Sequence, residues 1–344
     1  MSSLSTSSPS NETRNNRIQI AIISNLKFNI KGRDYGSEDK LLASELRKHN
    51  FQVEILHPET ILPLNDPPNA QILQNLTVLF FRNNYGGHLE QSYRHQLSKF
   101  ITDTDTNNPH NSKIFNDFQQ CHGDYQGKQH LLDLYSLGFP VIPSTRKLSD
   151  LTTPPFNPST PTTFMVKSMT GADSNDMQGN LTLPETILKF NALEKKSSEQ
   201  FVIQPMMDFV YEVSFYYFEG MFMYAMYNGG SETMQNNDGG EIDTEAASAK
   251  RWTLQIYEPT TKDLIFASKF IKWNNCHRQI QRIDAIRLLP SGTKDKEESE
   301  GELLLMEIED YNCWLSLSEL KDQAPNVFDS FIAALSESIT KFAT

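Results

Sequence analysis

Three features that often reveal what a protein does are scarce in this chain: cysteine, long apolar segments and basic charge. The cysteines are few, odd in number and far apart, at positions Cys121, Cys276 and Cys313. This spacing argues against a disulfide framework and against a zinc site, and it fits a reducing compartment, so we expect a cytoplasmic protein. Cys313 directly follows an acidic segment, and a structural role is favoured there over a catalytic thiol.

No segment approaches the roughly 18 apolar residues of a membrane-spanning helix, so no membrane partner is expected. Lysine and arginine total 31 against 43 aspartates and glutamates, which gives a formal net charge of −12. Nonspecific binding of nucleic acid therefore has no global electrostatic support. A chain of 344 residues with 38% hydrophobic content is long enough for two or three globular domains.

The first third of the chain reads as an α/β domain. Residues 1–16 are rich in Ser, Thr and Asn and are expected to form a disordered leader. Apolar runs then alternate with a helix-spaced segment, which predicts a β-α-β unit and a third strand. The ranges are 17–24, 37–49, 51–56 and 76–81.

The rest of the chain predicts a small antiparallel sheet with a helix on it, then a helix, two acidic strands and a terminal helix. The small sheet is expected from strands 164–167, 200–205, 212–218 and 222–227, with a helix at 183–193. A further helix is predicted at 259–274. The amphipathic C-terminal helix, 327–342, is expected to pack on the last domain.

The two acidic strands carry alternating charged residues. In a strand, residues two apart point to the same face, so Arg282 and Asp284 on one strand can meet Glu307 and Glu309 on the other. Carboxylates on apolar strands need a cation, and hard oxygen ligands suit a Mg²⁺ ion that also holds phosphates. The alternative is a hairpin with one solvated face.

Two lysines and a polar strand precede this pair. Lys128 stands near the start of a predicted helix, and Lys167 ends an apolar strand before the small-residue loop 171–174. Such lysines can hold phosphates, although a solvated surface amine is the alternative for each. Further on, Gln204 lies on an apolar strand that could bind an adenine, and Glu212 could bind ribose hydroxyls or be exposed.

Taken in order, these pieces resemble the ATP-grasp superfamily. The matching segments are GKQHLLDLYSLGFPVIPS, FMVKSMTGADS, FVIQPMMDFVYEVSF, QRIDAIR and LLLMEIEDYN, and they span residues 114–317. The layout is similar to D-alanine:D-alanine ligase and to glutathione-synthetase-like enzymes. The resemblance implies an α/β fold with an N-terminal preATP-grasp domain, 17–115, and a two-lobed ATP-binding region, 116–344. Its small lobe would cover about 160–228, and its C-terminal lobe about 250–344.

The resemblance also implies a role for each matched residue. Contacts to ATP are implied for Lys128, Lys167 and Ser174 at the phosphates, for Gln204, Pro205, Met206 and Met207 at the adenine, and for Glu212 at the ribose. Asp284, Glu307 and Glu309 match the ligands of Mg²⁺, which Mn²⁺ could replace. Arg282 matches the arginine that stabilises the reacting phosphoryl group and the tetrahedral species.

The chain departs from the family pattern at several positions. The usual Lys-Pro is Lys167-Ser168, and the loop ends in 174–176 without its final glycine. Glu309 stands where many members have Asn, which makes the site more acidic. Asp310 would face away from Glu309 in a regular strand, so it is left out of the metal ligands. Ligand contacts by Asn312, Lys250 and Arg251 are left open.

The resemblance implies an ATP-dependent carboxylate-amine ligase that forms an acyl phosphate and releases ADP and phosphate. The substrates would be a small-molecule carboxylate, such as an amino acid or a peptide-like acid, and an amine, and Arg82 is a candidate contact for the carboxylate. A homo-oligomer is compatible with the sequence. The alternatives are a small-molecule kinase on the same fold and a non-catalytic nucleotide-binding regulator of the synapsin kind.

Overall fold

The computed structural model describes most of the chain. The described residues are 17–27, 29–30, 33–60, 73–83, 96, 98–100, 102, 112–118, 120–156, 163–169, 178–196, 200–229, 254–289, 301–311 and 313–344. The leader 1–16 lies outside these ranges. Within the ranges, no helix has both the length and the apolar content needed to cross a bilayer.

The N-terminal part is a parallel sheet with the strand order β4-β1-β5-β6. Its strands are β1 (Gln19–Ser24), β4 (Gln52–Leu56), β5 (Val78–Asn83) and β6 (Lys113–Ile114). Helix α1 (Tyr35–Lys48) makes the first crossover, and its N-cap Asp34 accepts a hydrogen bond from the Ser37 N–H at 2.9 Å. The sequence predicted this β-α-β unit, because a strand buried on both faces reads as a continuous apolar run.

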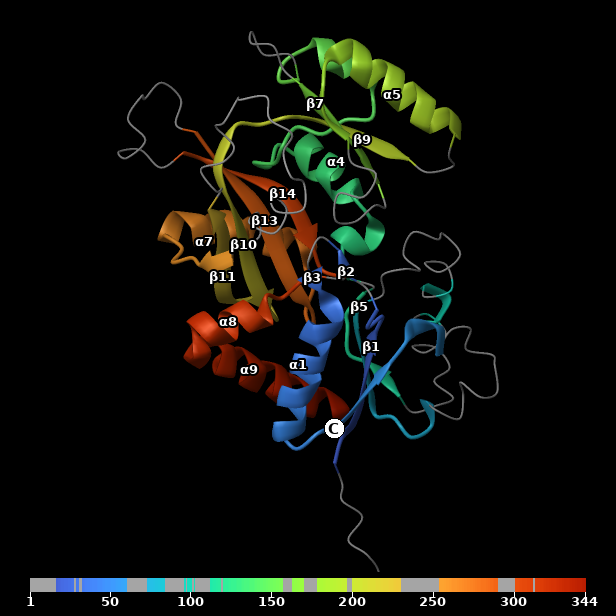
Figure 1. Cartoon of the computed structure of the whole chain (residues 1–344), viewed down its shortest axis with the longest axis vertical. Helices are drawn as coiled ribbons and strands as arrows, with labels where there is room; N and C mark the ends of the chain where they lie inside the picture. Colours follow the sequence, from blue (N-terminus) through green and yellow to red (C-terminus); the bar gives the residue numbers. More distant parts are fainter. Residues whose placement is uncertain are drawn as a thin grey trace, which may run out of the picture.

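A small antiparallel sheet with the order β8-β7-β9 stands at the top of Figure 1, covered by helix α5. Its elements are β7 (Phe164–Ser168), β8 (Gln178–Leu181), α5 (Leu183–Lys196) and β9 (Phe201–Pro205). Phe190 of α5 packs on Phe164, Val166 and Phe201 of the sheet in one apolar cluster. This three-stranded sheet and its helix form the small lobe.

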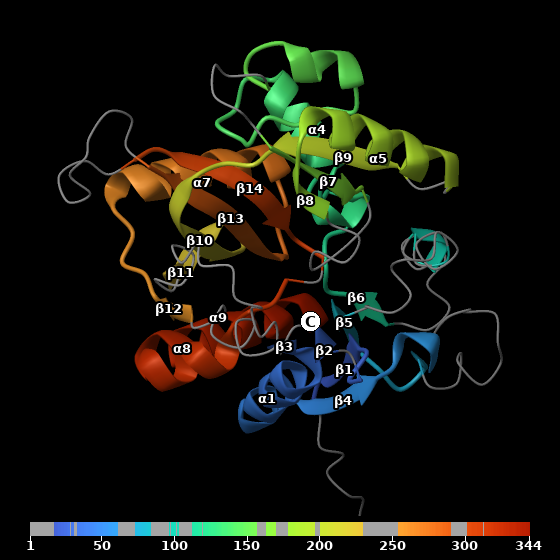
Figure 2. The same cartoon turned by 45° about the horizontal axis from the view of Figure 1, so that its top comes forward.

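The large sheet has five antiparallel strands in the order β12-β11-β10-β13-β14. They are β10 (Phe209–Phe218), β11 (Met221–Gly229), β12 (Leu254–Ile256), β13 (Ile280–Leu288) and β14 (Leu303–Glu309). Helices α4 (Gln129–Ser136) and α7 (Thr261–Asn274) share an apolar cluster with one face of this sheet. Figure 2 shows this sheet between the small lobe and the C-terminal helices.

The expectation that 212–218 and 222–227 belong to the small sheet was wrong. These segments are β10 and β11, and β10 pairs along its length with β13, from Phe209 opposite Leu288 to Phe218 opposite Ile280. Pairing partners depend on which apolar faces share a core. Phe215 of β10 and Ile283 of β13 both face α7, so β10 joins the large sheet.

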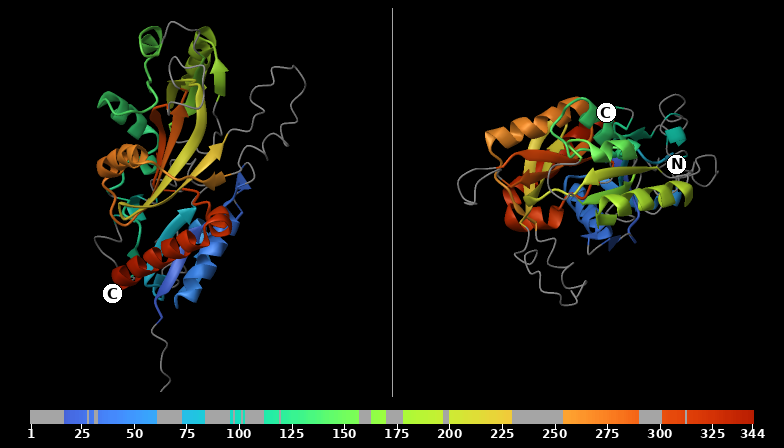
Figure 3. Two further views of the ribbon diagram at one scale, coloured as in Figure 1. Left: turned by 90° about the vertical axis from the view of Figure 1, so that its left-hand side faces the viewer. Right: turned by 90° about the horizontal axis from the view of Figure 1, so that it is seen from above.

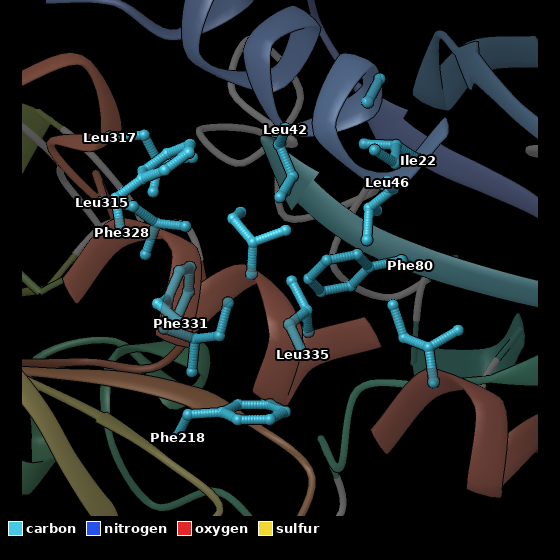
Figure 4. Packing of buried hydrophobic residues seen from close by; sticks show 14 of the residues in the cluster. Ile22, Leu42, Leu46, Phe80, Phe218, Leu315, Leu317, Phe328, Phe331 and Leu335 are labelled. Carbon is cyan, nitrogen blue, oxygen red and sulfur yellow. The ribbon is translucent and has the colours of Figure 1, made fainter. Parts of the chain in front are cut away.

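The C-terminal helices are α8 (Leu317–Gln323) and α9 (Pro325–Ala343). Both contact helix α1 of the N-terminal domain. The sequence placed the last helix on the last domain, and α9 does contact β11, but it also packs against α1. Figure 3 shows α9 between the large sheet and the N-terminal domain, and Figure 4 shows Phe331 and Leu335 between Phe218 and Leu42. One apolar core therefore spans both domains.

The remaining elements are short. They are β2 (Asn29–Ile30), β3 (Arg33–Asp34) and the 3-10 helices η1 (Pro58–Thr60), η2 (Asp124–Gln126) and η3 (Leu148–Thr152). Of these, η2 matters for the site, because it leads directly into Lys128 and α4.

Candidate active site

The predicted acidic strands are neighbours, and their charged side chains meet. In the register of β13 and β14, Arg282 lies opposite Glu309 and Asp284 lies opposite Glu307. The Arg282 guanidinium makes a two-pronged pair with Asp284, with both N···O distances at 2.8 Å. Its Nη2 also lies 2.6 Å from Oε1 of Glu309, and Nη1 donates to the Trp314 carbonyl at 3.0 Å. Ser214 of β10 donates to Asp284 at 2.7 Å.

A bulge in β14 aims the two glutamates. Asp284 pairs with Glu307, but the next residue of β13, Ala285, pairs with Leu305, so Met306 is an extra residue. A bulge of this kind shifts the alternation of side chains by one. Leu305 therefore packs in the core under α7, whereas Glu307, two residues on, faces the opposite side. In a regular strand without the bulge, Leu305 and Glu307 would point to the same face, because they are two residues apart.

Lys128 reaches this face from the start of α4. Its Nζ lies 2.6 Å from Oε1 of Glu307, and its own backbone N–H donates to the Met169 carbonyl at 2.7 Å. Burial raises the pKa of Glu307, but the ammonium groups of Lys128 and Lys167 outweigh burial and bring that pKa to about 2. Burial lowers the pKa of Lys128, and the Glu307 carboxylate more than offsets this, so the net shift is upward.

Lys167, on β7 of the small lobe, belongs to the same electrostatic group. Burial and the neighbouring Lys128 ammonium lower its pKa to about 8, against the attraction of Glu307. Glu212 of β10 also acts on Lys167, which places the predicted ribose carboxylate within electrostatic reach of the lysine. The structure thus brings Lys128, Lys167, Glu307 and Glu212 to one region between the small lobe and the large sheet.

The segment between the lobes holds the predicted adenine contacts. The Gln204 side chain is buried and donates from Nε2 to the Ser144 hydroxyl at 2.8 Å. The Met206 N–H donates to the Thr163 carbonyl at 2.8 Å. The assignment of Gln204 and of 205–207 to an adenine stays a prediction.

Several predicted contacts lie outside the described residues. These are Ser174, the altered loop at Asn175 and Asp176, Lys250, Arg251 and Asn312.

His130 fixes the strand that carries the glutamates. Its Nε2 accepts a hydrogen bond from the Ile308 N–H at 3.2 Å, and its Nδ1 lies 2.9 Å from the Gly127 carbonyl. An accepting Nε2 requires the neutral ring with its proton on Nδ1. Burial lowers the pKa of His130, which favours that neutral form. The histidine is a structural support between Glu307 and Glu309.

Asp124 and Asp310 each accept backbone N–H groups from the other's segment, an arrangement that we call the Asp124–Asp310 clamp and that the sequence did not predict. Asp124 of η2 accepts the backbone N–H groups of Asp310 and Tyr311, both at 2.8 Å. In return, Asp310 accepts the N–H groups of Gly123 at 3.0 Å and Tyr125 at 3.2 Å. The clamp ties the segment before Lys128 to the end of β14. Both aspartates stand in turns without periodicity, so no sequence pattern marks them.

Arg82, the candidate for a substrate carboxylate, is buried in the N-terminal domain. It pairs with Glu38 at 3.0 Å and with Asp39 at 3.2 Å, both on α1. A substrate would have to displace these partners. Cys313 is also buried, and burial raises the pKa of its thiol to about 12, which agrees with a structural role.

Several solved structures resemble this chain along most of its length. D-cycloserine synthetase DcsG has 16% identity and a TM-score of 0.60, with 92% of this chain and 99% of that chain covered. D-alanine–D-alanine ligase from Bacillus anthracis, complexed with ATP, has 13% identity and a TM-score of 0.56, with 96% of this chain and 100% of that chain covered. The ATP-grasp ligase PsnB, solved with a precursor variant, Mg and ADP, has 10% identity and a TM-score of 0.55, with coverages of 96% and 99%.

The chain has the ATP-grasp fold. No family model and no curated protein sequence matches it. The predicted fold class, an α/β ATP-grasp fold that begins with a β-α-β unit, is confirmed.

We call the charged face of β13 and β14, with Arg282, Asp284, Glu307 and Glu309, the active-site floor. Its three carboxylates are oxygen ligands of the type that Mg²⁺ prefers. Among the described residues, the ligand atoms of Asp284, Glu307 and Glu309 do not all lie within 4.8 Å of one another. The residues that do meet this distance are Cys121, Cys276 and Asp310. The three floor carboxylates are held by Lys128 and Arg282 in this structure. Their chemistry fits a hard divalent cation that takes over part of this neutralising role.

Proposed function

We propose that this protein is an ATP-dependent ligase that joins a carboxylate to an amine through an acyl phosphate. The observation that carries the proposal is the floor of the large sheet. There, Arg282 holds Asp284 and Glu309 while Lys128 holds Glu307, beneath a small lobe that supplies Lys167. The ATP-grasp fold and its similarity to solved ligases support this reading.

ATP would enter by an exchange of ionic partners. The phosphates would take the ammonium groups of Lys128 and Lys167, which releases Glu307 from its 2.6 Å pair. A bound Mg²⁺ would supply positive charge for the carboxylates and the phosphates. Because Lys128 keeps its backbone bond to Met169, only its side chain has to move.

The chemistry would have two steps. A carboxylate oxygen of the substrate attacks the γ-phosphorus of ATP, and ADP leaves. The amine then attacks the acyl carbon, loses a proton and displaces phosphate. Arg282 is anchored on Asp284 by two hydrogen bonds, and it can stabilise the charge that develops on the phosphoryl and acyl oxygens.

This chemistry needs no side-chain nucleophile. Cys313 is buried with a raised pKa, and His130 uses both ring nitrogens to hold backbone groups. The substrates proposed are a small amino acid or peptide-like acid and a small amine. Two of the similar structures act on compounds of that size, as their names, D-cycloserine synthetase and D-alanine–D-alanine ligase, state.

Product analysis tests the proposal. Purified protein would be incubated with ATP, Mg²⁺ and mixtures of amino acids and peptides, and the products identified by mass spectrometry. Release of ADP and phosphate with a new amide is expected. Release of AMP and pyrophosphate would overturn the proposal, a stable phosphorylated product would indicate a kinase, and ATP binding without turnover would indicate a regulator.

A further inference from the structure

Cys121 and Cys276 meet behind the active-site floor although they stand 155 positions apart in the chain. The Cys276 thiol donates to the Cys121 sulfur, with the two Sγ atoms 2.8 Å apart. Cys121 has no exposed surface, and Cys276 is 4% exposed. The wide spacing of the cysteines argued against a bridge, but the fold brings two of the three together.

The backbone on both sides of this contact is held in place. Cys121 lies on the loop between β6 and η2, and Cys276 lies just after the C-cap of α7. The His122 N–H donates to Asn274 at 2.6 Å, and the Asp117 N–H donates to Gln279 at 3.2 Å. These bonds fix the two loops against each other, so the sulfur contact does not depend on one movable side chain.

The carboxylate of Asp310 lies beside the two sulfurs, so a metal ion is the rival occupant. Two thiolates on a tetrahedral zinc, each at about 2.3 Å from the metal, lie about 3.8 Å apart. The sulfurs here are 2.8 Å apart, closer than such a site allows. Oδ2 of Asp310 already accepts from the Gly123 N–H and from the Asn274 amide, at 3.0 and 2.9 Å. The geometry therefore fits a bond between the sulfurs better than a metal between them.

We propose that Cys121 and Cys276 form an intrachain disulfide when the protein meets a low-molecular-weight disulfide as oxidant. The reaction is two successive thiol–disulfide exchanges. One protein thiolate attacks the oxidant and releases its first thiol, and the second protein thiolate then closes the Cys121–Cys276 bond and releases the second thiol. Two electrons and two protons pass to the oxidant.

The cross-link would join two supports of the active-site floor. Cys121 leads through Gly123 and Asp124 to Lys128, whereas Cys276 leads into β13, which carries Arg282. The small lobe lies within the loop that the bond closes and is not itself cross-linked. We therefore infer that oxidation stabilises the floor and leaves the small lobe able to move. This inference is independent of the proposed ligase activity.

Both thiols resist ionisation in the folded protein. The hydrogen bond with Cys276 and burial raise the pKa of Cys121. For Cys276, the hydrogen bond with Cys121 lowers the pKa, but burial and the carboxylates of Asp310 and Asp117 together outweigh it, so the net shift is upward. Exchange requires a thiolate, so the bond is expected to form slowly, over hours, in the native protein.

The test uses the full chain, fully reduced and then incubated with oxidised glutathione. Thiols that remain are alkylated with iodoacetamide under denaturing conditions, and the mass is measured. Reduced protein should take up three alkyl groups, one for each of its three cysteines. Oxidised protein should take up one, at Cys313, and a peptide map should show Cys121 joined to Cys276.

Stability gives a second readout. Oxidation should raise the Tm by roughly 5–10 °C, because the bond restricts the unfolded chain. Dithiothreitol should reverse the shift. Cys276→Ser should lose the shift, whereas the control Cys313→Ser should keep it. The mass measurement on wild-type protein decides the question even if a variant fails to fold.

Two outcomes would overturn the proposal. One is three alkylated cysteines after prolonged native oxidation. The other is stoichiometric binding of Zn²⁺ to the reduced protein that Cys276→Ser abolishes, which would assign the group to a metal.

Discussion

Two arginines of this chain are each held by two carboxylates, and their surroundings give them different uses. In the Arg82 cluster (Arg82, Glu38 and Asp39), the arginine is 4% exposed and both carboxylates are 1% exposed. In the Arg282 cluster (Arg282, Asp284 and Glu309), the arginine is 5% exposed but Glu309 is 15% exposed. The first cluster is sealed from solvent, whereas in the second one carboxylate, that of Glu309, is partly exposed.

The backbone explains why the Arg82 cluster is structural. Glu38 also accepts the N–H groups of Leu315 at 2.9 Å and Leu317 at 3.2 Å. These bonds tie α1 to the segment between β14 and α8, beside the apolar core that both domains share. In the Arg282 cluster, Glu309 is instead partly exposed, which fits the proposed approach of a cation from that side. A buried ion pair is structural when backbone N–H groups fill the remaining lone pairs of its carboxylates. It can bind a ligand when some of those lone pairs stay open to solvent.

The largest effect is expected from Arg82→Ala. Removing the arginine leaves Glu38 and Asp39 buried without their main counter-charge, which should cost about 3–5 kcal/mol of unfolding free energy. Denaturant unfolding followed by circular dichroism measures this. The control Lys40→Ala, on the exposed side of the same helix, should stay within about 0.5 kcal/mol of wild type. Equal stability of Arg82→Ala and wild type would contradict the structural role.

Arg282→Ala should act on turnover instead. Loss of the guanidinium should reduce kcat by about 100- to 1,000-fold, because a preorganised charge at the reacting group is missing. ATP binding should be retained, since the predicted phosphate contacts, Lys128 and Lys167, are unchanged. Steady-state kinetics and calorimetry of ATP binding separate the two effects.

Glu307→Ala is the matched comparison for Arg282→Ala. It removes a predicted metal ligand, so it should lose the Mg²⁺-dependent part of ATP binding as well as turnover. Wild-type activity in either variant would refute the assignment of the floor.

The Asp124–Asp310 clamp predicts a smaller effect. Asp124→Ala leaves the N–H groups of Asp310 and Tyr311 without their acceptor, which should cost about 1–3 kcal/mol. Because the clamp leads into Lys128, the KM for ATP should rise as well. Asp124→Asn keeps an oxygen acceptor and should restore most of both losses, as measured by unfolding and by kinetics. Equal damage in both variants would contradict the role of Asp124 as a hydrogen-bond acceptor.

The last effects concern pH, and here Glu38 of the Arg82 cluster and Glu307, which pairs with Lys128, should have opposite signs. Burial raises the pKa of Glu38 to about 7, above its ordinary 4.5, so the folded state holds an extra proton between these values and stability falls as pH rises. The pKa of Glu307 is about 2, so the unfolded state holds the extra proton between pH 2 and 4.5 and stability rises with pH.

Each slope has a limit of about 1.4 kcal/mol per pH unit. Unfolding free energies measured from pH 2.5 to 7.5 test both signs. Glu307→Gln should flatten only the acid limb, and Glu38→Gln only the limb above pH 4.5. A variant that flattens the other limb would exchange the two assignments.

Much of the candidate site was predictable because it depends on the alternation of side chains between the two faces of a strand. Asp284 with Arg282, and Glu307 with Glu309, needed only the two-residue period of a strand. The order of Lys128, Lys167, Gln204 and Glu212 then suggested the fold. The β-α-β unit was predictable for the same local reason, since buried strands and an amphipathic helix leave distinct periods.

Other features required contacts between distant segments. No pattern in the sequence indicates that β10 pairs with β13 in the large sheet, that Asp124 reaches Asp310, or that Cys121 meets Cys276. Met306 looks like any apolar strand residue, and only its pairing shows that it is a bulge. Each of these features depends on which distant segment packs against the residue in question, and local sequence patterns do not encode that.

The sequence by itself therefore determined the kinds of elements and which charged residues two apart on one strand share a face, since those follow from backbone periodicity. Only the tertiary structure decided which of two similar arginines is a support and which belongs to a site. The physical reason is solvation: Glu38 has its lone pairs filled by backbone N–H groups from 277 and 279 positions away, whereas Glu309 on Arg282 stays 15% exposed.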